Sequence, residues 1–217
     1  MKARFLALAA LVLGLASCQT EPEGLDVQMG GAVDATITVN IPDSETRAGG
    51  TKSAGSIFDN VDLSGDATIR YILMIYDANG VASKDRQVAY SDGKSVNFDV
   101  RLVPNRDYRF VVWADYVEGE ADVDYHYNTA DLTNITLKNT WVAMDETRDA
   151  FTGTRLVEDF NGSQGITVNL TRPFAKLRVM TTDMEELAKL QLTPTTAVVN
   201  YHTNHYSSFN AFTGQPF

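Results

Sequence analysis

One segment near the N-terminus constrains the fold more than any other, because its side chains alternate without a break. Residues 32–41 read AVDATITVNI, with an apolar residue at every second position from Val33 to Ile41. The positions between them are polar: Asp34, Thr36, Thr38 and Asn40. A period of two is typical of a β-strand with one buried and one exposed face. Pro42, which lacks the amide hydrogen that a sheet needs, ends the segment. We therefore expect a protein built on β-sheets.

Similar segments recur along the chain and are separated by short polar turns. Residues 68–77 are apolar on both faces in the middle, which predicts a central strand. The sequence DANG at 77–80 is a hairpin signal, since Asn-Gly favours positive φ. Further strands are predicted at 87–90, 95–102, 108–115, 165–170 and 173–181, with a helical turn within 144–151 and one short helix capped by Asp183. Antiparallel strands with short turns indicate an all-β sandwich with one or two short helices.

The first eighteen residues have the plan of a secretory signal. Lys2 and Arg4 precede an apolar run over 5–15, and Cys18 follows. The run is too short for a membrane-spanning helix, which needs about 20 apolar residues. Leu-Ala-Ser-Cys at 15–18 resembles a bacterial lipobox, whose cysteine is acylated and becomes the first residue of the mature protein. Two alternatives stay open: a chance cysteine in an ordinary signal peptide, and an uncleaved anchor.

Charge and cysteine content narrow the classes of partner. The formal net charge is −10, and a mature form without Lys2 and Arg4 has −12. So acidic a protein is not expected to bind nucleic acid or to dock electrostatically on anionic lipid. Attachment to a membrane then depends on lipid at Cys18. Because Cys18 is the only cysteine, we expect neither a disulfide framework nor a thiolate metal site.

These features divide the chain into four parts. Residues 1–17 are the lipoprotein signal peptide. Residues 18–31 are a flexible tether, acidic and containing Pro and Gly at its start. Residues 32–182 form the N-terminal β-sandwich domain. Residues 183–217 are the start of a second, truncated β domain.

The loop after the first strand is a candidate site of proteolysis. Residues 43–55 read DSETRAGGTKSAG, a polar sequence rich in Gly and Ser. Loops of this composition are exposed and are preferred places for nicking. A trypsin-like enzyme would cut between Arg47 and Ala48, and also after Lys52. The alternative is a plain loop between strands that contains an arginine.

Two groups of side chains raise the question of metal binding. Glu118, Glu120, Asp122 and Asp124 alternate and are followed by His126, so an extended backbone would put four carboxylates on one face for calcium. The alternative is a solvated acidic loop. His202 and His205 would point to opposite faces of a strand. No serine has the context of a nucleophile, and no Gly-rich phosphate loop follows a strand. We therefore expect no enzymatic activity, catalytic residue, cofactor or metal.

Several segments together resemble the fimbrillin-like surface lipoproteins of Bacteroidota, which are major and minor subunits of type V pili. The resemblance covers the lipobox and the strand and loop that lead to Arg47 and Ala48. It also covers YRFVVWAD at 108–115, RDAFTG at 148–153, VNLTRPFAKLRV at 168–179 and YSSFNAFTG at 206–214.

The resemblance implies a fold and a function. It implies transthyretin-like, Greek-key β-sandwich domains and export as a lipoprotein to the outer membrane and cell surface, with the lipid on Cys18. A trypsin-like protease then cuts after Arg47 and removes the lipid together with the strand in 32–47. A strand from a neighbouring pilus subunit fills the empty place, so the chain becomes part of a fimbrium that functions in cell adhesion. The implied role is that of a shaft, anchor or tip subunit, with host or bacterial surface ligands.

The sequence also departs from that family, and a second function stays open. Members usually have a second domain as long as the first, whereas few residues follow Thr182 here. This chain would then accept a strand but not donate one. The alternative is a monomeric surface lipoprotein that binds glycan or host protein. It predicts an exposed aromatic platform, formed by Tyr125 and Tyr127 or by Tyr201 and Tyr206.

Overall fold

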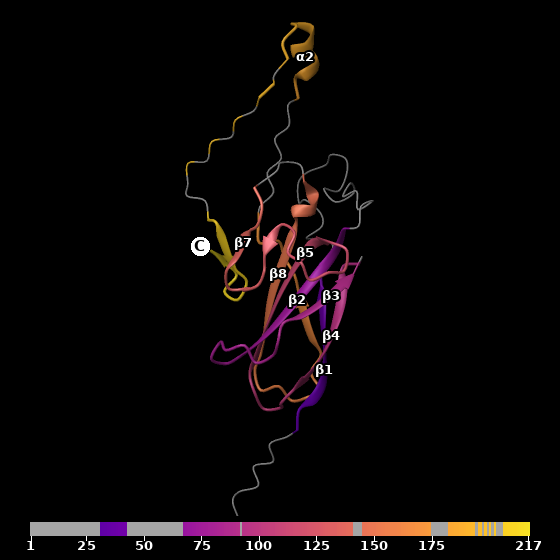
Figure 1. The fold of residues 1–217 in the computed structure, drawn as a ribbon, viewed down its shortest axis with the longest axis vertical. Coiled ribbons are helices and arrows are strands. Elements are labelled where there is room, and N and C mark those ends of the chain that lie inside the picture. The colour runs from indigo at the N-terminus through magenta and orange to yellow at the C-terminus, as the bar shows by residue number, and fades with distance from the viewer. Residues whose placement is uncertain are drawn as a thin grey trace, which may run out of the picture. The chain divides into compact units, whose positions relative to one another are not determined.

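The computed structural model describes residues 31–42, 67–91, 93–140, 145–174, 182–193, 195–196, 198, 200, 202 and 206–217, and there the strands form three sheets (Figure 1). The β1 sheet contains, in order, β4 (Ser95–Leu102), β1 (Val33–Asn40) and β9 (Ile166–Asn169). The central sheet contains β3 (Gln87–Ser91), β2 (Ala67–Asp77), β5 (Tyr108–Glu118) and β8 (Ala150–Val157). The short-strand sheet contains β11 (Gln215–Pro216), β10 (Ser208–Asn210), β7 (Ile135–Leu137) and β6 (Tyr127–Asn128).

The β1 sheet and the central sheet bury one apolar layer between them, which we call the main core. The alternation that predicts β1 is confirmed, since Ile37 and Val39 are fully buried while Asp34 and Thr36 are exposed. Phe98, Val100 and Ile166 come from the two neighbours of β1. The facing residues of β2 and β5 are also apolar: Ile69, Tyr71, Leu73, Ile75, Phe110, Val112, Ala114 and Tyr116. The predicted all-β sandwich is therefore confirmed.

The opposite face of the central sheet is also covered, by a second core. Ile72 of β2 and Trp113 of β5 pack there with Tyr127, Ile135 and Phe209 of the short-strand sheet. The Trp113 ring lies 5.4 Å from that of Tyr127 and 6.1 Å from that of Phe209, between centroids. Both faces of β2 are thus covered by other parts of the fold. This confirms the central strand predicted from the apolar residues on both faces of 68–77. The same holds for β5, which is longer than the predicted 108–115.

The predicted hairpin at 77–80 joins β2 to the segment that leads into β3. The amide of Gly80 donates to the carbonyl of Asp77 at 3.0 Å, and the Asp77 carboxylate accepts from the amides of Asn79 and Val81 at 2.9 Å each. Gly80 has φ +76°, a conformation that glycine adopts at little cost. β3 then runs antiparallel to β2, with Leu73 opposite Gln87.

The C-terminal part contains a short helix and two short strands. Helix α2 (Met184–Lys189) follows Asp183, whose side chain makes no capping hydrogen bond, and the helix has no buried residue. β10 pairs with β7 and places Phe209 in the second core. Gly31–Phe217 form one compact unit. The predicted boundary after residue 182 stays a prediction, and most of the predicted strand 173–181 lies outside the described residues.

The helical turn predicted within 144–151 is confirmed as the 3-10 helix η1 (Glu146–Arg148). Within the described ranges, no helix has both the length and the apolar character needed to cross a membrane.

Candidate functional site

Strand β1 occupies the middle of its sheet, although it comes first in the sequence. It pairs antiparallel with β4 along its whole length, from Val33 opposite Leu102 to Asn40 opposite Ser95. On its other side only the second half pairs, parallel to β9, from Ile37 beside Ile166. The sheet order β4-β1-β9 therefore depends on β1, which forms the hydrogen bonds that connect its two neighbours.

The inward side chains of β1 form a substantial part of the main core. Ile37 and Val39 have 0% exposure, and Ile41, just beyond the strand, has 4%. Burying three aliphatic side chains of this size stabilises a fold by about 5–9 kcal/mol. A domain is typically stable by only about 5–15 kcal/mol in total. Without β1 or a substitute, the main core would therefore lose contacts worth a large share of the domain's stability.

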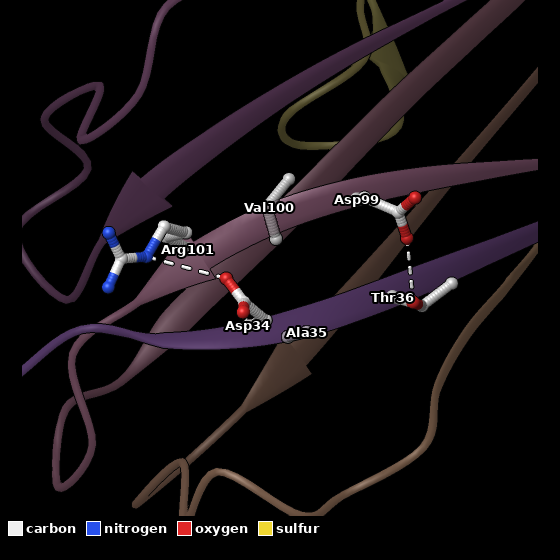
Figure 2. Close-up of a pocket in the computed structure, with 6 residues that line it drawn as sticks. All are labelled: Asp34, Ala35, Thr36, Asp99, Val100 and Arg101. Carbon is white, nitrogen blue, oxygen red and sulfur yellow. Dashed lines mark hydrogen bonds and ion pairs between the residues drawn. The ribbon is translucent and has the colours of Figure 1, made fainter.

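The outward side chains of β1 meet polar partners on β4. The Thr36 hydroxyl donates to the Asp99 carboxylate at 2.7 Å, and the Ser95 hydroxyl donates to the Asn40 side-chain oxygen at 2.7 Å. Asp34 and Arg101 form an ion pair, 3.4 Å from Oδ1 to Nε. Figure 2 shows the Asp34–Arg101 and Thr36–Asp99 pairs beside a shallow pocket on this face. These contacts are exposed, so they are accessible to another chain.

The two neighbours of β1 are held to the central sheet by contacts that do not involve β1. Beside β9, the amides and carbonyls of Thr152 and Thr171 exchange two hydrogen bonds of 2.8 Å. Ahead of β4, the Tyr71 hydroxyl donates to the carbonyl of Gly93 at 2.9 Å. If β1 left, β4 and β9 would thus remain anchored at two strand spacings, about 9–10 Å apart. We call this place, between β4 and β9, the β1 slot.

The site residues predicted from the sequence, Cys18, Arg47 and Ala48, all lie outside the described residues. Their place in the sequence is nevertheless informative. Arg47 and Ala48 fall between β1, which ends at Asn40, and β2, which begins at Ala67. A cut there would separate β1 and everything before it from the rest of the chain.

The acidic stretch after β5 forms a network around a buried arginine. Arg70 of β2 is fully buried and lies opposite Asp115 of β5. Its Nε and Nη2 donate to the two Asp115 oxygens at 3.0 and 2.9 Å. Nη1 donates to Asp122 at 2.9 Å, and Nη2 also donates to Asp124 at 3.0 Å and to Thr129 at 3.3 Å. We call these five residues, together with Arg86, the Arg70 network.

Arg86 joins the network from the surface. Its Nη2 donates to Asp122 at 2.8 Å, and its Nη1 donates to the carbonyl of Thr129 at 2.7 Å. Asp122 and Asp124 are thus paired with arginines, although Asp122 is exposed as the alternative of a solvated acidic loop predicts and Asp124 is half-buried. Glu118 and Glu120 are exposed. Among the residues that the structure describes, no group of His, Cys, Asp and Glu side chains is arranged to hold a metal ion, calcium included.

The network shifts the pKa values of its carboxylates in opposite directions. Burial raises the pKa of Asp115, against the opposing effect of the guanidinium beside it. A hydrogen bond from Arg86 lowers the pKa of Asp122. Burial opposes the shift at Asp124, but hydrogen bonds from Thr129 contribute to a net lowering of its pKa. One signal in the sequence points to this network, because an arginine inside an otherwise apolar strand must find a partner.

The predicted aromatic platform is not formed at 125–127. Tyr127 has only 2% exposure, and its hydroxyl donates to the carbonyl of Arg148 at 2.5 Å. The neighbouring His126 is also buried and shares a hydrogen bond of 2.7 Å with Thr147. Burial is the main cause of the lowered pKa of His126.

The remaining candidates near the C-terminus are only partly described. Tyr206 is 67% exposed, whereas Tyr201 lies outside the described residues. His202 is exposed, and His205 also lies outside them, so the histidine pair stays untested. Of the two predicted pairs, Tyr125 and Tyr127 do not form an exposed platform because Tyr127 is buried, and the pair of Tyr201 and Tyr206 stays a prediction.

The chain was compared with protein families, curated proteins and solved structures, and one family model matches most of it. Residues 27–217 match the model of a family described as a family of unknown function, DUF6562. No curated protein matches the chain. One solved structure is similar at a TM-score of 0.38 and 13% identity: a fimbrial assembly protein from Parabacteroides distasonis ATCC 8503. The match covers 65% of this chain and 53% of that protein, so the chain spans about half of the protein's length.

Proposed function

We propose that this chain, which belongs to the family of unknown function DUF6562, is a non-enzymatic structural subunit of a cell-surface fimbria or pilus. It is exported as a lipoprotein through Cys18, and cleavage after Arg47 prepares it to accept a strand from a neighbouring subunit. Its place in the fimbria is the shaft, the anchor or the tip.

The observation that carries this proposal is the position of β1. The strand is first in the sequence, central in its sheet and buried on its inward face. It is also followed by the long connection that contains Arg47. One cut in that connection would turn β1 from a covalent part of the fold into a separate segment, held only by contacts with β4, β9 and the main core.

Loss of that segment would leave the β1 slot open to another strand. The anchored edges of β4 and β9 would expose unpaired amides and carbonyls, and the main core would expose apolar side chains. Exposed edges of this kind pair readily with an extended strand of another chain. Because Cys18 precedes β1, release of β1 would also release the lipid. Anchoring and assembly would thus exclude one another within a single molecule.

The proposal is tested by determining the N-terminus of the protein on the cell surface by mass spectrometry. We expect a mature form that begins at Ala48 and is recovered in a high-mass assembly. The matched control is Arg47→Gln, which should keep lipidated Cys18 and remain outside the assembly. Lys52→Gln should be cleaved and assembled like the wild type. If Lys52→Gln instead blocked cleavage, the cut would lie after Lys52 rather than after Arg47. Lipidated Cys18 as the only form would contradict a shaft role.

A further inference from the structure

Strands β1 and β9 carry the same tetrapeptide and lie side by side. Residues 37–40 and 166–169 both read Ile-Thr-Val-Asn. The two strands are parallel and in register, so each residue is next to its counterpart: Ile37 to Ile166, Thr38 to Thr167, Val39 to Val168 and Asn40 to Asn169. The likeness extends by one residue, since Ile41 and Leu170 follow and are both buried.

Two neighbouring positions of the β1 sheet therefore accept one sequence pattern. In both strands the Ile and Val are buried against the central sheet, whereas Thr167 and Asn169 of β9 are exposed. The second half of the β1 slot is bounded by β4 on one side and by β9 on the other. It therefore provides backbone partners on two edges and pockets for aliphatic side chains at every second position. These contacts are not specific to one sequence.

The first half of the slot differs in kind. Residues 33–36 pair only with β4, and Asp34 and Thr36 are exposed. Their partners, Arg101 and Asp99, belong to β4 and would remain after β1 leaves. The segment in the corresponding place ahead of β9, 162–165, reads Gly-Ser-Gln-Gly and has neither the acid nor the threonine. The likeness of the two strands thus stops where the charged contacts begin.

We infer that the β1 slot recognises an incoming strand in two parts. The occupant is an extended segment of another subunit, with an aliphatic–Thr–aliphatic–Asn–aliphatic pattern that fills the second half of the slot. An acid and a hydroxyl residue ahead of that pattern meet Arg101 and Asp99. Arg101 and Asp99 are thus specificity residues, and the aliphatic pockets provide most of the affinity. The inference rests on the proposed function, because it requires that β1 be replaceable.

The charged contacts also set the direction of the occupant. Any strand between β4 and β9 is antiparallel to one neighbour and parallel to the other, since β1 is antiparallel to β4 and parallel to β9. The apolar alternation is the same in both directions. Only the direction of β1 brings the acid beside Arg101 and the hydroxyl beside Asp99. Reversal would place the acid near Ser95 at the other end.

The test uses the full chain with a site for a sequence-specific protease in place of residues 45–50 and with Cys18→Ser. The cut protein is unfolded in urea and refolded by dilution with excess fluorescent peptide of residues 32–42. Bound peptide is measured by size-exclusion chromatography. Refolding of the uncut protein is the positive control, and the cut protein without peptide shows whether its own β1 segment returns to the slot. An Ile37→Asp peptide should not be retained, because a carboxylate would enter the main core.

The recognition of charge is tested by exchanging the partners. An Asp34→Lys peptide should bind the cut protein about 1.5- to 5-fold more weakly than the native peptide, the range expected for one exposed ion pair. On an Arg101→Glu protein the order should invert, and the Lys peptide should bind better. Arg101 is 69% exposed at its side chain, so this variant should fold normally.

The outcomes separate this inference from the function on which it rests. If the uncut protein refolds but the cut protein retains neither the native peptide nor its own β1 segment, strand acceptance fails and the inference fails with it. If native and Asp34→Lys peptides bind equally to both proteins, recognition by Arg101 is overturned while strand acceptance stands.

Discussion

The two faces of the central sheet are covered in different ways. On one face, β2 and β5 present the apolar side chains of the main core to the β1 sheet. On the other face, the same two strands carry Arg70 and Asp115 beside the apolar second core. One cover is therefore held mainly by hydrophobic contact, with a few hydrogen bonds between uncharged groups, and the other by charged hydrogen bonds as well.

This difference bears on which cover can be exchanged. Hydrophobic contact has no directional preference, so a strand with the right alternation can replace another. Charged hydrogen bonds require particular partners at particular distances, and an unpaired buried charge is costly. The Arg70 network connects β2 and β5 to the stretch from Asp122 to Thr129. If β1 is exchanged as proposed, we therefore expect the second cover to stay in place.

The largest effect is expected from a charge placed in the main core. Ile37→Asp should lower the free energy of unfolding by more than about 4 kcal/mol, since it removes an aliphatic contact and buries a carboxylate without a partner. Urea unfolding followed by circular dichroism measures it. Thr36→Ala, on the outward face of β1, is the matched control and should cost less than about 1 kcal/mol. Equal losses for both variants would contradict the account of the main core.

A somewhat smaller loss is expected on the other face. Arg70→Met should lower the free energy of unfolding by about 3–5 kcal/mol, because Asp115 remains buried without its partner. The double variant Arg70→Met, Asp115→Leu should recover much of the loss, as an apolar pair leaves no buried charge. The comparison is again made by urea unfolding. A double variant as unstable as the single one would show that the charges themselves are not the cause.

Acid should weaken the Arg70 network through Asp122. Its pKa is lowered in the folded protein, so its contribution is present above its unfolded pKa of about 3.9 and is lost as the pH falls through the folded value. Asp122→Asn should therefore be less stable than wild type at pH 7, by about 1 kcal/mol or less for this partly exposed pair. The difference should shrink as the pH falls through the folded pKa of Asp122. A difference independent of pH would assign the effect to packing.

The smallest effect is expected at the outward face of β1. Asp34→Asn in the intact chain should change the free energy of unfolding by less than about 0.5 kcal/mol, because its ion pair with Arg101 is exposed. Thermal unfolding at low and high salt measures it. A large loss would mean that the pair stabilises the intact fold, and its role would then be structural rather than one of recognition.

Elements whose signal lies within one segment of the sequence could be predicted, whereas elements that form by pairing with distant segments could not. β1, β2, β4 and β5 follow from local alternation or from apolar runs, because each strand is long enough to show its period. β6, β7, β10 and β11 have two or three residues each, too few for any period, so the third sheet could not be foreseen.

The site shows the same limit. Arg70 in an apolar strand indicates a buried ion pair, yet its partners Asp122 and Asp124 lie 52 and 54 residues away and nothing local identifies them. The platform at Tyr125 and Tyr127 fails because the burial of Tyr127 depends on Trp113, which belongs to another strand. By contrast, the sequence does place Arg47 after the first strand, although the central position of that strand emerges only from pairings with distant segments.

The pairing of β1 also has a consequence for the order of folding. β1 is the first of the described strands to be synthesised, but its neighbours in the sheet begin at Ser95 and Ile166. Contacts between segments so far apart in sequence form late, because closing long loops costs entropy before any contact repays it. We therefore expect the central sheet, β4 and β9 to fold before β1 takes its place between β4 and β9. We expect an interval during biogenesis when this position is still vacant and a foreign strand competes with the native one.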